Sequence, residues 1–185
     1  MTSRYAEGML SIVLPTYNES MNIVRLIERL VAQLQGSDFE IIIVDDDSPD
    51  KTWEVAQQFA AKDSRVRVLH RRGERGLSSA VVKGFSIARG DILLVMDADG
   101  QHDVSVVSEL ARCIQQGAIL SVTSRYMPGG SVGEWVTGRR ILSRLGTWFA
   151  QSLPPVRVSD PMSGFFALRA DTYASIASRM HPQGF

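Results

Sequence analysis

The sequence predicts an α/β fold whose mostly parallel sheet carries helices on both faces. Short apolar runs without polar alternation, typical of strands covered on both sides, recur along the chain. Stretches with one apolar stripe at helical spacing separate them, so strand and helix alternate through residue 123. Acidic and polar side chains directly follow three of the strands, at the positions where open α/β sheets bind ligands.

The first half of the chain contains three strand and helix pairs. A strand is expected at Leu10–Leu14, closed by Pro15 because proline cannot donate a hydrogen bond to a sheet. Apolar residues at helical spacing from Ile23 to Leu34 predict the first helix, with Gly36 as a C-cap. The remaining elements expected here are strands at 39–44 and 66–69 and helices at about 52–61 and 79–88.

The second half starts with a central strand, Ile92 to Met96, which runs directly into the segment DADGQH. The apolar pattern then predicts a helix at 104–116 and a strand at 119–123. A glycine-rich loop follows, and the last elements expected are a helix at 141–152, a strand at 164–168 and a helix at 171–178. The alternation predicts right-handed crossovers within a single domain spanning residues 1–185.

Composition limits the classes of function. Twenty basic residues balance twenty acidic ones in 185, so no bulk charge favours nucleic acid and we expect no nucleic-acid partner. A single cysteine excludes an internal disulfide. The chain starts without a signal-peptide pattern and has no run of about 18 apolar residues. We therefore expect a cytoplasmic protein, with contact to a membrane surface left open.

Asp97 and Asp99 follow the central strand one residue apart, and Gln101 continues the alternation. In extended backbone all three side chains would point the same way. Two bare carboxylates about 4 Å apart repel by roughly 4 kcal/mol at an effective dielectric near 20, and a divalent cation would reverse that repulsion. Carboxylate and amide oxygens favour Mg²⁺ or Mn²⁺. The alternative interpretation is a solvated acidic loop after a core strand.

Two further polar clusters, at 15–19 and 45–47, follow the first two strands and would share one crevice with the acidic pair. A nucleotide placed there would have its ribose hydroxyls accepted by Asp46 or Glu19 and its base against the ring of Tyr17. The alternatives are a solvated, helix-capping turn at 45–47 and a first-turn helix acid at Glu19. Glycine-rich phosphate loops, zinc spacings and the GxSxG elbow are absent from the sequence.

These segments together carry a resemblance to a known family. They read PTYNE (15–19), VDDDSPDKT (44–52), the loop 71–77, DADGQH (97–102), TSRY (123–126) and SGFF (163–166). The series resembles the inverting family 2 glycosyltransferases of GT-A fold, and within them the dolichol- or polyprenol-phosphate mannosyltransferases. The resemblance implies a Rossmann-like, mostly parallel sheet flanked by helices. It also implies metal-assisted transfer of mannose from GDP-mannose to a polyprenyl (dolichyl) phosphate with inversion.

The resemblance also assigns roles to individual residues. Those implied to bind the donor are Pro15, Tyr17, Glu19, Val44, Asp46, Asp97, Ala98, Asp99 and Gln101, and three of these, Asp97, Asp99 and Gln101, would hold the metal. Those implied to meet the acceptor phosphate are Arg125, Arg139 and Ser143. Asp97, Asp99 and Arg125 would be the catalytic residues. The implied location is peripheral, at the cytoplasmic face of the endoplasmic reticulum in a eukaryote or of the plasma membrane in a prokaryote.

The predicted helix at 141–152 has arginines near its start and apolar residues at helical spacing. It would lie in a bilayer interface with its arginines on headgroups or on the acceptor phosphate. The alternative is a helix packed on the sheet with arginines in solvent. If the acceptor were a sugar hydroxyl, Asp160 would be the best candidate base, its alternative role being that of a turn residue. His102 is a further candidate for binding a phosphate group, its alternative role being that of a surface loop residue.

The chain departs from the family pattern in two places. Asp47 and Lys51 stand where the family often has glycine, and the sequence stops at Phe185, before a region with which family members continue. We therefore expect the domain to be incomplete at its C-terminus. Two other functions stay open: a UDP-sugar-dependent transferase with another polyprenyl phosphate or saccharide acceptor, and a non-catalytic nucleotide-binding subunit. Haloacid-dehalogenase-type phosphatases carry their acidic pair after the first strand, which this chain does not.

Overall fold

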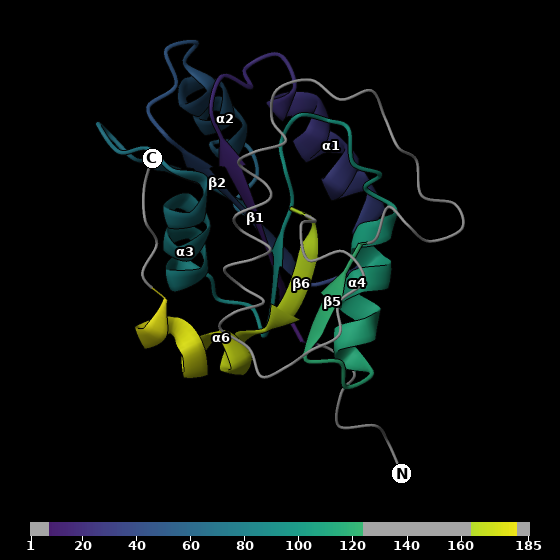
Figure 1. The fold of residues 1–185 in the computed structure, drawn as a ribbon. Helices are drawn as coiled ribbons and strands as arrows, with labels where there is room; N and C mark the ends of the chain where they lie inside the picture. The colour runs from purple at the N-terminus through teal and green to yellow at the C-terminus, as the bar shows by residue number, and fades with distance from the viewer. Residues whose placement is uncertain (1–7, 124–163, 181–185) are drawn as a thin grey trace.

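The computed structural model describes residues 8–123 and 164–180 (Figure 1). Within these residues, six strands form one sheet in the order β3-β2-β1-β4-β6-β5. The strands are β1 (Leu10–Thr16), β2 (Phe39–Asp45), β3 (Val66–His70), β4 (Ile92–Val95), β5 (Leu120–Val122) and β6 (Phe166–Arg169). The helices are α1 (Ile23–Gln33), α2 (Thr52–Ala60), α3 (Leu77–Ile87), α4 (Val106–Gln115), α6 (Ala170–Ile176) and the 3-10 turn η1 (Ala177–Arg179).

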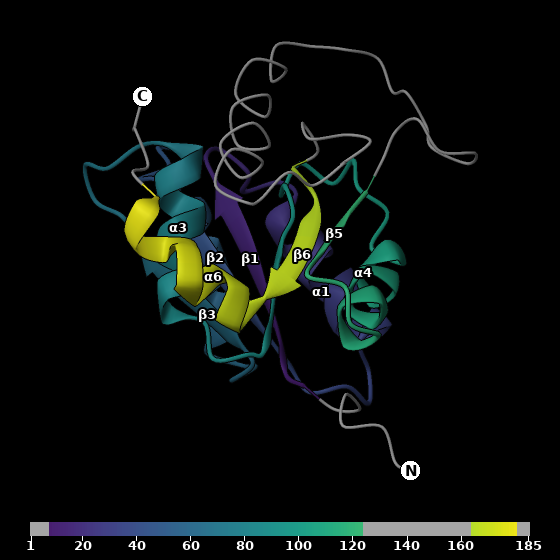
Figure 2. The same cartoon turned by 60° about the horizontal axis from the view of Figure 1, so that its bottom comes forward.

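The sheet has a hydrophobic core on each of its faces. Successive residues of a strand point to opposite faces, so Ile12 and Ile43 join the core under α1 and α4, whereas Val13 and Ile42 join the core under α3 and α6. Figure 2 shows α3 and α6 on one side of the sheet and α1 and α4 on the other. This two-sided cover explains why residues 12–15 of β1 and 41–44 of β2 are apolar without alternation.

β1 to β4 form the predicted parallel half of the sheet, because β1 pairs in parallel with β2 and β4, and β2 pairs in parallel with β3. The predicted α/β class and mostly parallel sheet are confirmed. The boundaries of the described elements fall within about two residues of those expected from the pattern.

β5 runs in the predicted parallel direction, because both β4 and β5 pair antiparallel with β6, but β6 lies between them. β6 runs antiparallel between β4 and β5, with Phe166 opposite both Val95 and Val122. β5 therefore lies at the sheet edge and does not contact β4 as a neighbour. Apolar periodicity reports that a segment is a strand, but it carries no information on which strand will pair with it.

The prediction that Pro15 ends the first strand was wrong, because β1 continues to Thr16. The Leu10 N–H bonds to Asp38, just before β2, and the Thr16 carbonyl accepts from Asp46, just after it, so even-numbered positions face β2. The nitrogen of Pro15 therefore faces β4, whose pairing with β1 ends at Val13 opposite Val95. No ladder hydrogen bond is lost there, and proline is tolerated.

Of the described helices, none combines the length and apolar character that crossing a bilayer requires.

Candidate functional site

The parallel half of the sheet places three polar segments at one edge. β1 lies between β2 and β4, with Thr16 opposite Asp45 and Val13 opposite Val95. Hydrogen bonds continue beyond the paired strands, from the Asp46 N–H to the Thr16 carbonyl at 3.1 Å and from the Met96 N–H to the Val13 carbonyl at 3.2 Å. The segments 15–19, 45–47 and 97–101 therefore leave neighbouring strands side by side.

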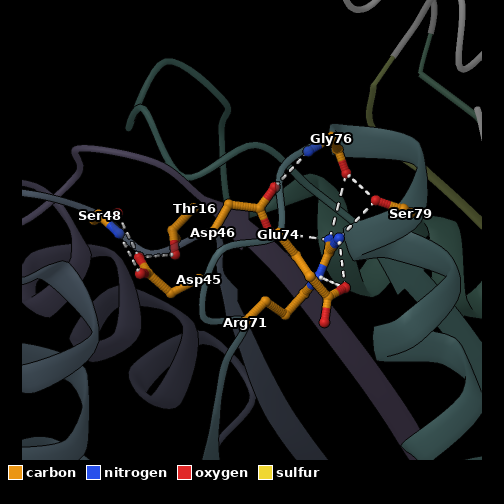
Figure 3. A network of polar contacts seen from close by, with 8 residues as sticks. All are labelled: Thr16, Asp45, Asp46, Ser48, Arg71, Glu74, Gly76 and Ser79. Carbon is orange, nitrogen blue, oxygen red and sulfur yellow. Dashed lines mark hydrogen bonds and ion pairs between the residues drawn. The ribbon is translucent and has the colours of Figure 1, made fainter. Parts of the chain in front are cut away.

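Asp45, the first of three successive aspartates, stabilises the turn that follows β2. It accepts hydrogen bonds from the Thr16 hydroxyl at 2.9 Å and from the Ser48 N–H and hydroxyl at 2.9 and 2.6 Å (Figure 3). The Ser48 hydroxyl oxygen in turn accepts from the Asn18 N–H at 3.0 Å. Asp45 is fully buried, so its role is to join the ends of β1 and β2.

The second carboxylate, Asp46, faces residues 71–76, hereafter the 71–76 loop. Its Oδ2 accepts from the Gly76 N–H at 2.7 Å, and Oδ1 lies 3.0 Å from Nη1 of Arg71, an ion-pair distance without hydrogen-bond alignment (Figure 3). The two side chains are 9% and 3% exposed. Burial raises the pKa of Asp46, although Arg71 and the Gly76 amide act to lower it. Asp46 is thus a buried carboxylate at the site edge rather than a free one.

Arg71 is the buried partner that gives this loop its shape, and sequence reasoning assigned it no role of its own. Besides Asp46 it contacts the Ser79 hydroxyl at 2.7 Å, the Gly76 carbonyl at 3.4 Å and the Glu74 carboxylate at 3.2 Å (Figure 3). A single sequence offers no signal that separates it from Arg72 or Arg75, because all three stand in the same polar run. Its burial is decided by the tertiary structure.

Tyr17 projects from the β1 end and is 40% exposed. The Arg75 side chain reaches it from the 71–76 loop: Nη2 donates to the Tyr17 hydroxyl at 2.6 Å, and the guanidinium carbon lies 4.6 Å from the ring centroid. The aromatic surface predicted to meet a nucleobase is therefore shared with an arginine, which itself stacks well on flat rings.

Glu19 lies in the electrostatic field of the acidic pair. Burial raises its pKa most; Asp99, Asp50 and Asp97 raise it further, against a hydrogen bond from Asn22 that lowers it. The structure therefore brings the carboxylates of two strand ends close enough to repel one another.

The acidic pair itself does not continue as a strand. Asp97 is half-buried, with Nε2 of His102 3.4 Å from its Oδ2, while Asp99 is exposed and accepts the Gln101 N–H at 2.9 Å. This turn replaces the extended backbone on which the shared direction of the three side chains was predicted. Ala98 between them is buried, and Gln101 is exposed.

The oxygens of Asp97, Asp99 and Gln101 suit a metal site that the protein shares with its substrate. Among the described residues, no group of three or more His, Cys, Asp or Glu side chains is arranged to enclose a metal ion. Mg²⁺, however, is commonly held by one or two carboxylates, with substrate phosphates and water completing its shell. An exposed Asp99 beside a half-buried Asp97 fits that shared arrangement and does not fit a closed protein cage.

The other predicted residues divide into two groups. Pro15 and Val44 are buried in paired positions of β1 and β2. Outside the described residues lie Arg125, Arg139, Ser143, Asp160 and the predicted helix at 141–152.

The chain is similar in sequence and in fold to several known proteins. The chain is 44% identical over 177 residues to dolichol-phosphate mannosyltransferase of Pyrococcus furiosus, covering 95% of this chain and 49% of that protein. Among solved structures it resembles mannosyl-3-phosphoglycerate synthase from Rubrobacter xylanophilus, with a TM-score of 0.65, 20% identity and coverage of 89% and 54%. It also resembles a mannosyltransferase from Pyrobaculum calidifontis in complex with GDP-Man and Mn²⁺, with a TM-score of 0.60, 17% identity and coverage of 91% and 46%.

The chain spans about half the length of each of these proteins. The two solved structures share its fold, which is the GT-A arrangement expected from the motif series. A family model described as glycosyl transferase family 2 matches residues 11–176, which includes every described strand except the first residue of β1. The chain therefore belongs to glycosyltransferase family 2.

Proposed function

We propose that this chain is the nucleotide-sugar-binding and catalytic part of an enzyme that transfers mannose from GDP-mannose to a polyprenyl (dolichyl) phosphate, with inversion at the anomeric carbon. The observation that carries the proposal is the convergence of the β1, β2 and β4 ends, which gathers Glu19, Asp97 and Asp99 at one edge. The relative from Pyrococcus furiosus supports the choice of sugar and acceptor.

In this proposal the donor lies across the three strand ends. The nucleoside contacts the segment 15–19 and the β2 end at 44–46, with Tyr17 against the base and Glu19 or Asp46 accepting hydroxyl protons. Because Asp46 already binds Arg71 and Gly76, its contribution would be a fixed, oriented acceptor rather than a mobile one. The diphosphate lies over the segment 97–101.

Asp97 and Asp99 would hold Mg²⁺ or Mn²⁺ together with the donor diphosphate, and Gln101 would add its amide oxygen. When bound, the cation supplies positive charge that stabilises the departing diphosphate. Ala98 lies between the two acids and is buried. The manganese in the Pyrobaculum calidifontis complex supports a divalent cation of this type.

The acceptor phosphate needs no base, because it is already anionic near neutral pH. One of its oxygens forms a bond to the anomeric carbon from the face opposite the diphosphate. The bond to the diphosphate breaks and its electron pair leaves with GDP, so the configuration inverts. We propose Arg125, Arg139 and Ser143 as its binding residues, since arginine presents a planar donor fork that matches phosphate. Asp160 would act as a base only for a hydroxyl acceptor.

The polyprenyl chain of such an acceptor is embedded in a membrane. The protein would therefore work at a membrane surface, facing the cytoplasm where nucleotide sugars are present. The arginine-flanked apolar segment 141–152 is our candidate for the stretch that contacts that surface.

The test is transfer of labelled mannose from GDP-mannose to a polyprenyl phosphate in detergent, with Mg²⁺ or Mn²⁺ and with a chelator as control. Mannolipid that forms only with the cation supports the proposal. GDP-mannose binding without transfer would instead indicate a nucleotide-binding subunit. Stronger thermal stabilisation by a UDP-sugar than by GDP-mannose would indicate the alternative donor and refute the assignment.

A further inference from the structure

We propose that Asp47 is a positioning residue for the donor site: its carboxylate fixes the 71–76 loop in the conformation in which that loop contacts Asp46 and Tyr17. The inference depends on the proposed function for the roles of Asp46 and Tyr17 toward the nucleoside. It concerns a residue that the site prediction did not include.

The two oxygens of Asp47 contact two different segments. Oδ1 lies 2.7 Å from Nε2 of His70, the last residue of β3, and Oδ2 accepts the Gly73 N–H at 3.2 Å. The His70 ring is fixed from a further side by Trp53 of α2, whose ring is stacked on it at 4.3 Å with an interplanar angle of 12°. The Asp47 carboxylate thus connects the end of β2 to the His70 side chain and to the middle of the 71–76 loop.

The position of Gly73 explains why this connection matters. It lies two residues after Arg71 and two before Arg75, and three before Gly76. Arg71 and the Gly76 amide both contact Asp46, and Arg75 contacts Tyr17 through its hydroxyl and its ring. Holding the amide of Gly73 therefore limits the movement of the whole segment that meets these two site residues.

Asp47 is a carboxylate at neutral pH. The hydrogen bond from His70, followed by that from the Gly73 amide, holds the pKa of Asp47 below its usual range. The charged groups that face it are His70 and Arg72, both of which favour the ionised form.

The backbone at this position permits a clean substitution. Asp47 has a φ of 55°, in the left-handed region where glycine is at ease, so Asp47→Gly removes the carboxylate without adding strain. Lys51 offers a matched control, because it has a φ of 62° at the same edge and its side chain contacts only the exposed Glu54 among the described residues. Lys51→Gly makes the same backbone change without touching the loop.

The experiment measures two quantities in both variants: amide hydrogen exchange at Gly73 and Gly76, and the Kd for GDP with Mg²⁺. For Asp47→Gly we expect exchange about tenfold faster at both amides, since the loop loses its fixed point. We expect the Kd for GDP to rise about fivefold, as for the loss of a charge-assisted hydrogen bond that orders a loop. Lys51→Gly should leave both near the wild-type values, and Tm should change by no more than about 2 °C in either variant.

A conservative variant separates positioning from general destabilisation. Asp47→Asn keeps an acceptor for the Gly73 N–H and an amide that can donate to unprotonated His70, and asparagine tolerates the left-handed backbone. It should restore most of the exchange protection and most of the affinity for GDP.

Unchanged exchange at Gly73 in Asp47→Gly would overturn the inference, because the loop would then be held by other contacts. Faster exchange with an unchanged Kd would overturn the positioning role. If the wild-type chain itself does not bind GDP, the proposed function fails for this donor and the donor role of Asp47 fails with it. The exchange data still show in that case whether Asp47 fixes the loop.

Discussion

Glu40 offers the sharpest test of how this sheet is held at the end opposite the site. The residue is 2% exposed in β2, and its carboxylate accepts three hydrogen bonds. Oε1 accepts from the Ser11 hydroxyl at 2.7 Å and from the Arg89 N–H at 2.6 Å, and Oε2 accepts from Arg67 at 2.7 Å. The Ser11 oxygen also accepts the Gly90 N–H at 2.8 Å, so the group ties the segment between α3 and β4 to the sheet.

Glu40→Gln keeps the shape and one carbonyl oxygen but turns an NH₂ group toward the Arg67 guanidinium. The lost interaction is a charge-assisted hydrogen bond at a buried acceptor, so we expect the free energy of unfolding to fall by about 2 kcal/mol. The control is Glu109→Gln, which removes a pair of similar length, 2.6 Å to Arg112, in which both side chains are 57% exposed. That change should leave the free energy of unfolding close to the wild-type value, because exposed ion pairs contribute little.

Equilibrium unfolding in urea, followed by circular dichroism at pH 7, measures both variants. With a slope of about 2 kcal/mol per molar, the Glu40→Gln midpoint should fall by roughly 1 M while that of Glu109→Gln barely moves. Equal midpoints for the two variants would refute the reasoning, since burial would then make no difference to the value of the pair.

The pH dependence gives a second check on Glu40. Burial raises its pKa, but the hydrogen bonds from Arg67, Ser11 and Arg89 outweigh that effect and the net shift is downward from 4.5. A depressed folded pKa means that the carboxylate stabilises the fold above the unfolded value and loses this contribution as the pH falls below it. The stability difference between wild type and Glu40→Gln should therefore be full at pH 7 and shrink below about pH 4.5.

Three further outcomes follow from the same structure. Asp99→Ala should abolish cation-dependent GDP binding in a calorimetric titration. Its Tm should stay within about 2 °C of wild type, because the side chain is exposed. GDP binding that still depends on the cation would refute the metal assignment. Gly84→Ala should lower the free energy of unfolding by about 1–3 kcal/mol in urea, since its Cβ would lie 2.4 Å from a methyl carbon of Val13; an unchanged midpoint would contradict this packing. Glu19→Gln should weaken donor binding yet raise Tm by about 1–2 °C at pH 7, because burial and neighbouring carboxylates raise the pKa of Glu19. This gain in Tm should vanish below about pH 4.5, where the glutamate is protonated in the unfolded chain as well. A lower Tm at pH 7 would argue against the repulsion.

The secondary structure was largely readable from the sequence. The apolar runs in β1, β2 and β4 and the apolar stripes of α1 and α4 depend on residues close together in the chain, and periodicity reports these directly. The placement of acidic segments beyond parallel strands follows as well, because parallel neighbours end at the same edge. The position of β6 between β4 and β5 was not predicted, because this strand joins the sheet after residues 124–163 have intervened.

The site was readable by residue type but not by partner. Asp46 is predicted to accept ribose hydroxyls, and the structure adds its contacts with Arg71 and Gly76, which the sequence does not indicate. Tyr17 is predicted to contact a nucleobase, and the structure adds its contact with Arg75, 58 residues away in sequence. Such contacts depend on the register between β2 and β3 and on the path of the loop that follows.

By itself the sequence determined the fold class, the motif series that places the chain in its family, and the carboxylates available for a cation, because each of these is written in contiguous or regularly spaced residues. The tertiary structure decided which carboxylates are structural, as in Asp45, and which are exposed, as in Asp99. The physical reason is that burial and hydrogen-bond partners come from segments distant in sequence. Whether an acidic side chain is buried and hydrogen-bonded or exposed therefore depends on how the strands are arranged in the sheet.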